Sequence, residues 1–426
     1  MKAEVIRIID SCRVCNSKEL IPILSLGDLY VSDFLDLEDN TADDTKAPLE
    51  LVFCDPMKGG CGLLQTKHTV SHEAMYRNYW YRSGINKTMN DELTDVVNKV
   101  ESIIPLASGD YVIDIGSNDS TTLRLYKTEG LNRVGFEPAK NLVEKYGLEG
   151  VTKVITDFFN YKAWQKEYGE KKVKVITAIA MFYDLDDPNS FVADMVKCLD
   201  EDGLIIIQML YLPSFLERNA FDGICHEHLE YYSMFSLENL LARHDLEVFD
   251  AECRPINEGS LRFYIRRKGR GNGFNVDKKI EEKVRDFREQ EKQIGVNNRA
   301  SYDAFVERVN VIRDKVKKFV NQEIAAGKKI YGYGASTKGN TLLQYFNLDN
   351  TKIVAIADRN PDKWGKKTVG TNISIISEEQ ARNEKPDYFL VLPWHFINEF
   401  KDREVEFLKS GGKFIIPLPE FNIIES

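Results

Sequence analysis

Two of the six histidines of the chain flank a carboxylate in one short run, His226-Glu227-His228-Leu229. Histidine is the side chain best suited to move protons near neutral pH, and a neighbouring carboxylate or phenol can orient it and shift its pKa. The run therefore predicts a site of acid–base chemistry. Two other interpretations stay open: a surface loop with solvated histidines, and a metal site in which His226 and His228 share one face of an extended segment.

Acidic or turn-forming residues follow three successive apolar runs that read as strands: Asp114 and Gly116, then Glu137, then Asp157 with Phe158. The carboxyl ends of parallel strands meet at one edge of a sheet, where open α/β sheets bind ligands. Asp114 can accept hydrogen bonds from a cationic amino-acid group. Glu137 can bind both hydroxyls of a ribose, and Asp157 with Phe158 can bind the amino group of adenine and stack against its ring.

No G-x-G-x-x-G run follows the first of these strands, so the turn Gly116-Ser117-Asn118 offers no cradle for a diphosphate. S-adenosylmethionine therefore fits this edge better than NAD, with Asn118 as a further contact. Each residue alone is weak evidence, because a strand end is often only a tight turn or a solvated carboxylate. Three in succession favour a cofactor site.

Four of the seven cysteines form two pairs, Cys12 with Cys15 and Cys54 with Cys61. Two such turns can complete a tetrahedral thiolate site, which suits a structural zinc ion that stabilises a short module. The alternatives are unrelated free cysteines or a redox pair. Three cysteines lack this spacing and are not expected to bind the metal: Cys198, Cys225 and Cys253.

Apolar runs of strand length alternate with amphipathic segments along the rest of the chain. This alternation predicts an α/β protein with a parallel sheet covered on both faces. Strands are expected at 110–115, 133–136, 153–155, 173–180, 203–209 and 262–265, and helices at 89–104, 123–127, 141–145 and 189–198. Two charged helices, at 278–292 and 301–326, should lead to a second α/β unit with strands at 330–333, 353–357, 388–392 and 413–416.

We therefore expect a zinc-binding module at 1–72, a class I Rossmann-like domain that binds S-adenosylmethionine at 73–298, and a C-terminal Rossmann-like domain at 299–426. The formal charge of −10 argues against nucleic acid as the main partner, since a phosphate backbone needs a basic face. The sequence contains no apolar run of membrane-spanning length, and its first ten residues do not resemble a signal peptide. A cytoplasmic protein with no membrane partner is expected.

Over essentially its whole length the chain resembles the nucleotide-sugar C-methyltransferases that make branched deoxysugars. The resemblance is carried by the four paired cysteines and by the runs Tyr79-Trp80-Tyr81-Arg82-Ser83-Gly84, Ser117-Asn118-Asp119, His226-Glu227-His228-Leu229 with Tyr231-Tyr232, Gly332-Tyr333-Gly334-Ala335-Ser336-Thr337-Lys338-Gly339-Asn340 and Leu392-Pro393-Trp394-His395. The chain departs from the family pattern at Cys225, where a tyrosine is usual, at Ser120, where a glycine is usual, and over 180–185.

The resemblance implies methyl transfer from S-adenosylmethionine to carbon 3 of a 4-keto-6-deoxy sugar carried on a nucleoside diphosphate. A proton beside a ketone is acidic enough for a positioned base to remove, and the enolate carbon can then attack an electrophilic methyl group. The family assigns the base to the residue that matches His228, assisted by Glu227. Tyr79 and Tyr81 would close over the methyl group and the sugar.

In the C-terminal lobe, Gly332 and Gly334 follow a strand and Asp358 ends the next, as in a dinucleotide site, but the third glycine is misplaced. The N-terminus of the following helix, with Ser336 and Lys338, can instead hold the sugar diphosphate. The alternative is a lobe that only packs. The expected substrate-binding residues are His226, Tyr231, Ser336, Lys338 and Trp394.

Two further functions stay open at this stage. One is an O- or N-methyltransferase acting on a nucleotide-sugar, in which the same histidine would serve a hydroxyl or an amine. The other is a non-catalytic, zinc-containing module that binds nucleotide-sugars. A pure binding protein needs no base, so Glu227 and His228 favour an enzyme.

Overall fold

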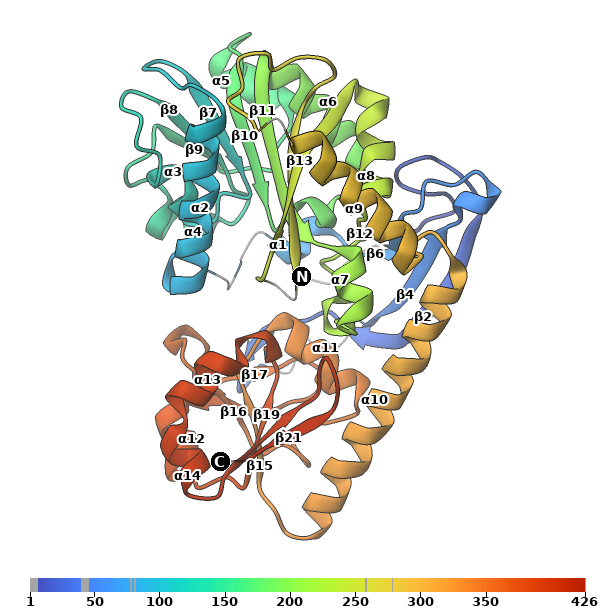
Figure 1. Cartoon of the computed structure of the whole chain (residues 1–426). Helices are drawn as coiled ribbons and strands as arrows, with labels where there is room; N and C mark the ends of the chain where they lie inside the picture. The colour runs from blue at the N-terminus through green and yellow to red at the C-terminus, as the bar shows by residue number, and fades with distance from the viewer. Residues whose placement is uncertain are drawn as a thin grey trace.

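The protein consists of two α/β lobes joined along one side by N-terminal strands, as the computed structural model shows (Figure 1). The structure describes residues 7–39, 46–76, 79, 82–256, 259–277 and 279–425. The central sheet forms one lobe and the C-terminal sheet the other. The long helix α10 (Arg299–Ala325) runs beside the C-terminal lobe.

The central sheet has seven strands in the order β13-β14-β11-β10-β7-β8-β9. The strands from β11 to β9 are parallel, and β14 and β13 add an antiparallel edge. Their bounds are β7 Tyr111–Ile115, β8 Asn132–Phe136, β9 Lys153–Ile155, β10 Val173–Ile179, β11 Leu199–Leu210, β13 Leu246–Arg254 and β14 Ser260–Arg267. The predicted strands are confirmed, and the edge strand β13 is an addition.

Helices cover both faces of this sheet, and polar side chains set where several begin. Asn86 caps α2 by accepting a hydrogen bond from the backbone of Thr88, and Asp187 caps α6 in the same way through Ser190. The helices are α2 Lys87–Ile103, α3 Thr121–Arg124, α4 Lys140–Leu142, α5 Tyr161–Tyr168, α6 Pro188–Cys198, α7 Leu212–Glu217, α8 Met234–Leu241 and α9 Ile280–Ile294. The helix expected at 123–127 is shorter than predicted, and the one expected at 141–145 is α-helical over Lys140–Leu142 and continues as a π-helix over Val143–Gly147.

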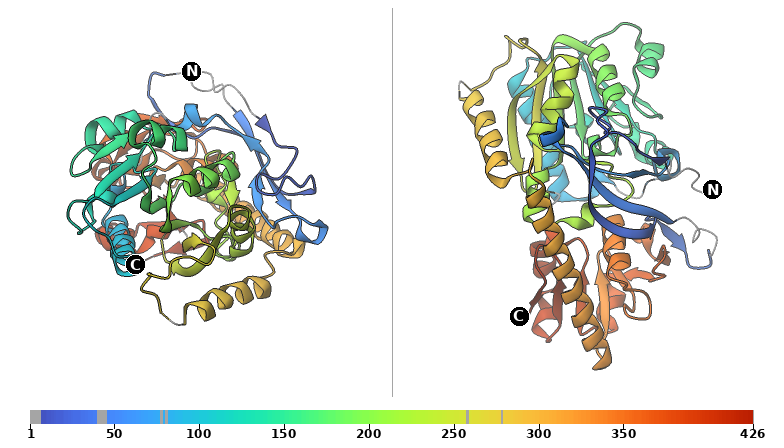
Figure 2. Two further views of the ribbon diagram at one scale, coloured as in Figure 1. Left: turned by 90° about the horizontal axis from the view of Figure 1, so that it is seen from above. Right: turned by 90° about the vertical axis from the view of Figure 1, so that its right-hand side faces the viewer.

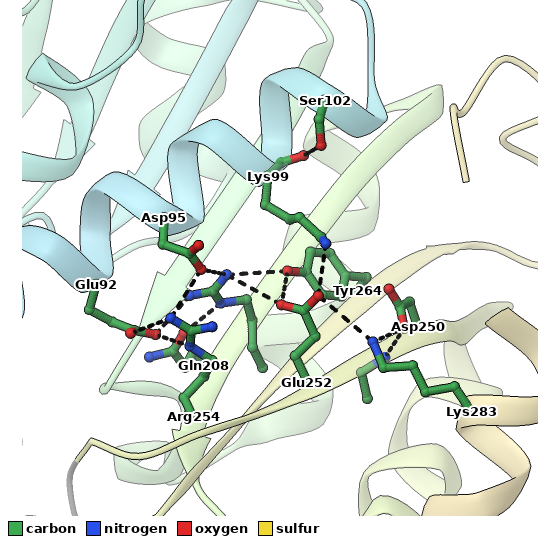
Figure 3. A network of polar contacts seen from close by, with 12 residues as sticks. Glu92, Asp95, Lys99, Ser102, Gln208, Asp250, Glu252, Arg254, Tyr264 and Lys283 are labelled. Carbon is green, nitrogen blue, oxygen red and sulfur yellow. Dashed lines mark hydrogen bonds and ion pairs between the residues drawn. The ribbon is translucent and has the colours of Figure 1, made fainter. Parts of the chain in front are cut away.

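A buried charge network fastens α2 to the antiparallel edge of the sheet (Figure 3). Glu92 on α2 accepts hydrogen bonds from Arg254 and from Arg262, at 2.7 to 2.8 Å. Arg262 is fully buried and also donates to Gln208 and Asp95. Because buried charges are tolerated only when they are paired, this network fixes the position of α2 on the sheet.

The N-terminal module is a four-stranded antiparallel sheet in the order β12-β5-β4-β2, and one of its strands comes from the His226–Tyr232 segment. The strands are β2 Leu20–Tyr30, β4 Lys46–Cys54, β5 Leu64–Thr66 and β12 Glu230–Tyr231. Two short strands, β1 Arg7–Ile8 and β6 His68–Thr69, pair beside it, and helix α1 spans His72–Tyr76.

The same module also contacts the C-terminal lobe. Strand β3 (Phe34–Asp36) pairs with β17 (Lys366–Thr368), and the Tyr30 backbone exchanges two hydrogen bonds with the Gln344 side chain. Figure 2 shows the N-terminal strands lying along one side of the molecule, against the junction of the two lobes. The N-terminal module therefore contacts both lobes and connects them.

The C-terminal sheet has the order β18-β16-β15-β19-β20-β21, parallel except for β21. Its elements are β15 Ile330–Tyr333, α11 Thr337–Tyr345, β16 Ile356–Asp358, β18 Ile375–Ser377, α12 Glu378–Asn383, β19 Tyr388–Val391, α13 Ile397–Arg403, α14 Val405–Lys409, β20 Lys413–Ile416 and β21 Asn422–Ile424. The four predicted strands are confirmed. Across the residues described, no helix has the length and apolar character needed to cross a membrane.

Candidate functional site

A cavity of about 1170 Å³ lies where the three parts of the chain meet. Its wall combines the carboxyl edge of the central sheet, residues 31–35 of the N-terminal module and the N-terminal end of α11. The sequence-predicted residues on this wall are Tyr79, Asp114, Gly116, Asn118, Glu137, Phe158, Glu227, His228, Ser336 and Lys338. The folded chain therefore brings most of the predicted cofactor, base and substrate residues into one space.

Asp114 lies near the end of β7, at the carboxyl edge of the central sheet where the cofactor is expected, and its carboxylate is buried. Thr177 Oγ1 donates to its Oδ1 at 2.5 Å, and burial raises the pKa of Asp114 to about 7. A cationic group beside it would favour the ionised form. At Gly116, φ is +68° and a side-chain Cβ would lie 3.1 Å from Met181 Cγ, so this turn favours glycine.

Glu137 follows β8 and is held by two backbone N–H groups. Asn118 N–H donates to one carboxylate oxygen at 2.7 Å and Ala139 N–H to the other at 2.9 Å. Burial raises the pKa of Glu137. Each oxygen keeps a further lone pair, so the carboxylate can also accept two ribose hydroxyls. Together with Asp114 and the Phe158 ring on the same wall, these groups fit the amino acid, ribose and base of S-adenosylmethionine.

Two motifs that are far apart in the sequence are joined at this edge. Arg82 Nε donates to Asp119 Oδ2 at 3.1 Å, and Gly84 N–H donates to the same oxygen at 3.0 Å. Ser83 N–H donates to Asn118 Oδ1 at 3.0 Å. The segment 82–84 is therefore fastened onto the turn that follows β7.

Tyr79 reaches the cavity from the same stretch of chain. Asn141 holds its backbone, accepting from Tyr79 N–H at 3.1 Å and donating to Tyr79 O at 2.9 Å. The rings of Tyr76 and Tyr79 lie 5.8 Å apart, and burial raises the pKa of both phenols well above the usual value. Both therefore stay protonated and able to donate near neutral pH. Tyr81 lies outside the described residues.

The His228 ring is oriented by a backbone carbonyl. Its Nδ1 lies 2.8 Å from Gly223 O, and its ring centroid lies 4.4 Å from that of Tyr183. Because a carbonyl oxygen only accepts hydrogen bonds, Nδ1 carries the proton and the neutral ring keeps its lone pair on Nε2. This tautomer can take a proton from a substrate in the cavity.

Charged groups from all three parts of the chain surround Glu227. Burial raises the pKa of Glu227 to about 7, the positive charge of Lys338 opposes this rise, and the negative charge of Asp33 adds to it. Burial likewise raises the pKa of Asp184 well above its usual value, and Glu227 adds to this rise. Lys338 therefore faces a group of carboxylates beside the proposed base.

Four predicted residues do not line the cavity. His226 Nε2 lies 3.0 Å from Ala47 O on β4, and burial lowers the pKa of His226 to about 4. Tyr231 donates to Gly223 O at 3.0 Å, Trp394 Nε1 donates to Asp222 Oδ2 at 3.0 Å, and Asp157 accepts from the backbone N–H of Phe158 at 2.9 Å. Within the described residues, His226 belongs to no group that could hold a metal, so the pairing of His226 with His228 considered from the sequence is wrong.

The turn after β15 is already filled by side chains of its own lobe. Asp358 accepts from Ala335 N–H and Asn360 N–H, both at 2.7 Å, and Lys363 Nζ donates to Ala335 O at 2.7 Å. In a dinucleotide site these positions would serve the cofactor. Ser336 accepts from Gly339 N–H and caps α11. Lys338, on the first turn of that helix, faces the cavity.

The four paired cysteines come together in the N-terminal module. The Sγ atoms of Cys12 and Cys61 lie 3.5 Å apart and those of Cys15 and Cys54 lie 3.4 Å apart, and all four lie within 4.8 Å of one another. This closed thiolate set fits a structural zinc ion. Asn189 of α6 donates to Arg13 O and to Val14 O, at 3.0 and 2.9 Å, so the first cysteine turn docks onto the central domain.

Sequence reasoning did not find several groups on the cavity wall: Asp33, Tyr76, Tyr183 and Asp184. Asp184 follows β10, so its position after a strand was a usable signal. Asp33 and Tyr76 belong to the N-terminal part of the chain, and no local pattern marks them. They reach the site only because the N-terminal module packs against both lobes.

Comparisons with known proteins identify three matching domains along the chain. Residues 12–76 match a domain described as "Putative zinc binding domain", residues 85–251 a "Methyltransferase domain" and residues 255–419 a "C-methyltransferase C-terminal domain". The chain is 29% identical to C-methyltransferase NovU of Streptomyces niveus over 424 residues, which are 99% of each chain.

Two solved structures each align with less than half of the chain. One is magnesium protoporphyrin IX methyltransferase of Synechocystis (9% identity, TM-score 0.34, 43% of this chain and 88% of that chain). The other is 1,6-didemethyltoxoflavin-N1-methyltransferase of Burkholderia thailandensis (12% identity, TM-score 0.33, 43% of this chain and 80% of that chain).

The matched domains follow one another in the order zinc-binding, methyltransferase and C-methyltransferase C-terminal, and the last spans the lobe that supplies Lys338 to the cavity. The chain is thus a methyltransferase enzyme with an N-terminal zinc-binding module, and it is similar to a C-methyltransferase over its whole length.

Proposed function

We propose that the protein transfers a methyl group from S-adenosylmethionine to carbon 3 of a 4-keto-6-deoxy sugar carried on a nucleoside diphosphate, with His228 as the base. The observation that carries the proposal is the Nδ1 contact of His228 with Gly223 O, which in the neutral ring places the lone pair on Nε2, and His228 lines the cavity. The cofactor edge of the central sheet lines the same cavity.

S-adenosylmethionine, when bound, supplies an electrophilic methyl group on a positively charged sulfur. Asp114 would hold its amino group and Glu137 its ribose, while Phe158 lies on the same wall for the adenine ring. The backbone contacts of Glu137 fix that carboxylate before the cofactor arrives. Such preorganisation lowers the cost of binding.

Removal of a proton from the sugar needs an acceptor and a way to hold the charge that develops on the ketone oxygen. His228 Nε2 would take the proton from carbon 3, leaving an enolate whose carbon 3 forms the new carbon–carbon bond. Tyr79 stays protonated and could donate to the enolate oxygen, while the Tyr76 hydroxyl donates to Glu227 O at 3.3 Å. Glu227, with a pKa near 7, would assist His228.

The nucleoside diphosphate must lie where the cavity meets the C-terminal lobe. Lys338 supplies a positive charge there, and Ser336 and Lys338 belong to the helix start on the wall. His226, Tyr231 and Trp394 would support this site from behind rather than contact the sugar, since their polar atoms bond to Ala47, Gly223 and Asp222.

Exchange of the carbon-3 proton tests the base without methyl transfer. A 4-keto-6-deoxy nucleotide-sugar incubated with the protein in D₂O and S-adenosylhomocysteine should gain deuterium at carbon 3. His228→Gln should slow this exchange and the methyl transfer by about 10²-fold or more. His244→Gln, away from the cavity wall, is the control and should exchange at the wild-type rate. Equal exchange by wild type and His228→Gln would reject the assignment.

A further inference from the structure

A second group of metal-ligating side chains lies at the cavity wall, separate from the four-cysteine site; Glu227 and His228 line the cavity and Cys225 is buried beside them. Cys225, Glu227 and His228 each offer one ligand atom, and these atoms lie within 4.8 Å of one another. The backbone explains their convergence: His228 N–H donates to Cys225 O at 3.2 Å, and this turn brings the three side chains together. Glu227 and His228 line the cavity, so an ion could reach them.

The chemistry of this set selects one class of metal. One thiolate, one imidazole and one carboxylate form a three-ligand set of the kind that binds zinc and leaves a fourth position open. The soft thiolate and the imidazole favour zinc or cobalt over magnesium and calcium, which take oxygen ligands. The four-cysteine site differs, because its ligand set is closed.

The second contact of the histidine supports the same interpretation independently. Histidines that bind metals usually donate their other ring N–H to a carbonyl or a carboxylate, which orients the ring toward the ion. Here Nδ1 of His228 donates to Gly223 O, so the lone pair of the neutral ring lies on Nε2, the nitrogen that would bind a metal ion. Tyr231 donates to the same carbonyl at 3.0 Å and fixes its position.

The charges around the group favour a cation. Asp184 and Asp222 line the cavity together with Glu227, and Lys338 is a cation whose charge acts on Asp184 and Glu227; Arg82 and Lys363 also lie on this wall. A divalent ion beside Glu227 would reduce the repulsion among these carboxylates. The positive charge of Lys338 acts against the ion but does not outnumber the acidic groups.

We propose that Cys225, Glu227 and His228 bind a zinc ion and that its binding inhibits methyl transfer. The inhibition rests on the proposed function, because the metal takes the Nε2 lone pair that would otherwise accept the carbon-3 proton. Metal binding itself does not depend on that function. The Cys225 proton leaves to solvent when the thiolate binds the ion.

The binding test uses full-length protein whose four-cysteine site already holds zinc. Cobalt(II) added to it should give a thiolate-to-metal charge-transfer absorption that saturates at one further ion per chain. Cys225→Ser should lose this absorption and weaken cobalt binding by about 10²-fold, while Cys253→Ser, which changes an exposed cysteine, should keep both. No absorption in the wild type, or equal absorption in Cys225→Ser, would overturn the site.

The inhibition test titrates zinc into the methyl-transfer assay. Zinc should abolish turnover, and a chelator of moderate affinity should restore it. Cys225→Ser, measured against its own uninhibited rate, should need about 10²-fold more zinc for half-inhibition. Turnover that rises with zinc, or half-inhibition at the same concentration in both proteins, would contradict the inference. Cobalt binding needs neither sugar nor methyl donor, so a protein that binds cobalt at Cys225 without methylating a sugar would reject the proposed function alone.

Discussion

Replacement of Asp114 by asparagine should stabilise the unliganded protein while weakening cofactor binding. Burial raises the pKa of Asp114 from its usual 3.8 to about 7 in the folded state. A carboxyl whose folded pKa lies above its unfolded pKa costs stability as pH rises. The cost is absent below about pH 4, grows between about pH 4 and 7, and is constant above.

The size of the effect follows from the shift. At about 1.36 kcal/mol per pKa unit, a shift of about three units corresponds to roughly 4 kcal/mol at pH 8 and roughly 3 kcal/mol at pH 6. Asp114→Asn should raise the free energy of unfolding by up to these amounts, since its amide oxygen can still accept the hydrogen bond from Thr177. The gain should be about 1 kcal/mol larger at pH 8 than at pH 6.

Urea unfolding followed by circular dichroism at the two pH values measures this gain, with Glu201→Gln as a control at an exposed position. Calorimetry with S-adenosylhomocysteine measures how much affinity for the cofactor product Asp114→Asn loses. The cationic amino group of the ligand favours ionised Asp114, so the wild type should bind about tenfold more tightly at pH 8 than at pH 6. Binding at pH 6 should release a proton from Asp114 to the solvent, whereas binding at pH 8 should release almost none. Asp114→Asn should bind weakly at both. A stability gain that is the same at both pH values, together with pH-independent wild-type binding, would show that the pKa of Asp114 is not raised by burial.

Three further outcomes follow from the contacts. Glu137→Ala should weaken S-adenosylhomocysteine binding by about tenfold or more in calorimetry, and unchanged affinity would argue against the ribose contact. Cys54→Ser should lose zinc by metal analysis and unfold at a lower temperature, whereas Cys198→Ser should keep its zinc; a metal-free, equally stable wild type would contradict the zinc assignment. Glu92→Ala, which removes the buried carboxylate shared by Arg254 and Arg262, should cost up to about 3–5 kcal/mol of unfolding free energy, and Asp95→Ala, whose side chain is 46% exposed, about 1 kcal/mol or less; equal losses would show that burial does not set the cost.

The two sheets could be predicted because their signals are local. Runs such as Val112–Ile115 and Ile330–Tyr333 are buried in the structure, and each is followed by a turn that a glycine at positive φ allows. The cofactor residues at strand ends could be predicted for the same reason, since each directly follows an apolar run. Once the strands are parallel, their carboxyl ends must lie at one edge.

The N-terminal module shows what the sequence could not reveal. Its long strand β2 contains Pro22, Ser25 and Gly27, which interrupt any strand pattern, and its register shifts near these positions. The pairing of Phe34 with Thr368 joins segments more than three hundred residues apart, and no local pattern marks it. Asp33 reaches the cavity only because this pairing forms.

The His226-Glu227-His228 run shows a different limit. Its residue types predicted a chemical site, but the direction of each side chain depends on the backbone. An extended segment would place both histidines on one face. The hydrogen bond from His228 N–H to Cys225 O instead makes a turn, so His228 lines the cavity while His226 contacts Ala47 on β4.

The most direct test of the account is the position of the transferred methyl group. The protein would be incubated with S-adenosylmethionine labelled with ¹³C in its methyl group and with a panel of 4-keto-6-deoxy nucleotide-sugars, and the products analysed by two-dimensional NMR. We expect a labelled methyl group bonded to carbon 3 of the sugar, absent with His228→Gln. A labelled methyl group on oxygen or nitrogen, or carbon methylation at the wild-type rate by His228→Gln, would contradict it.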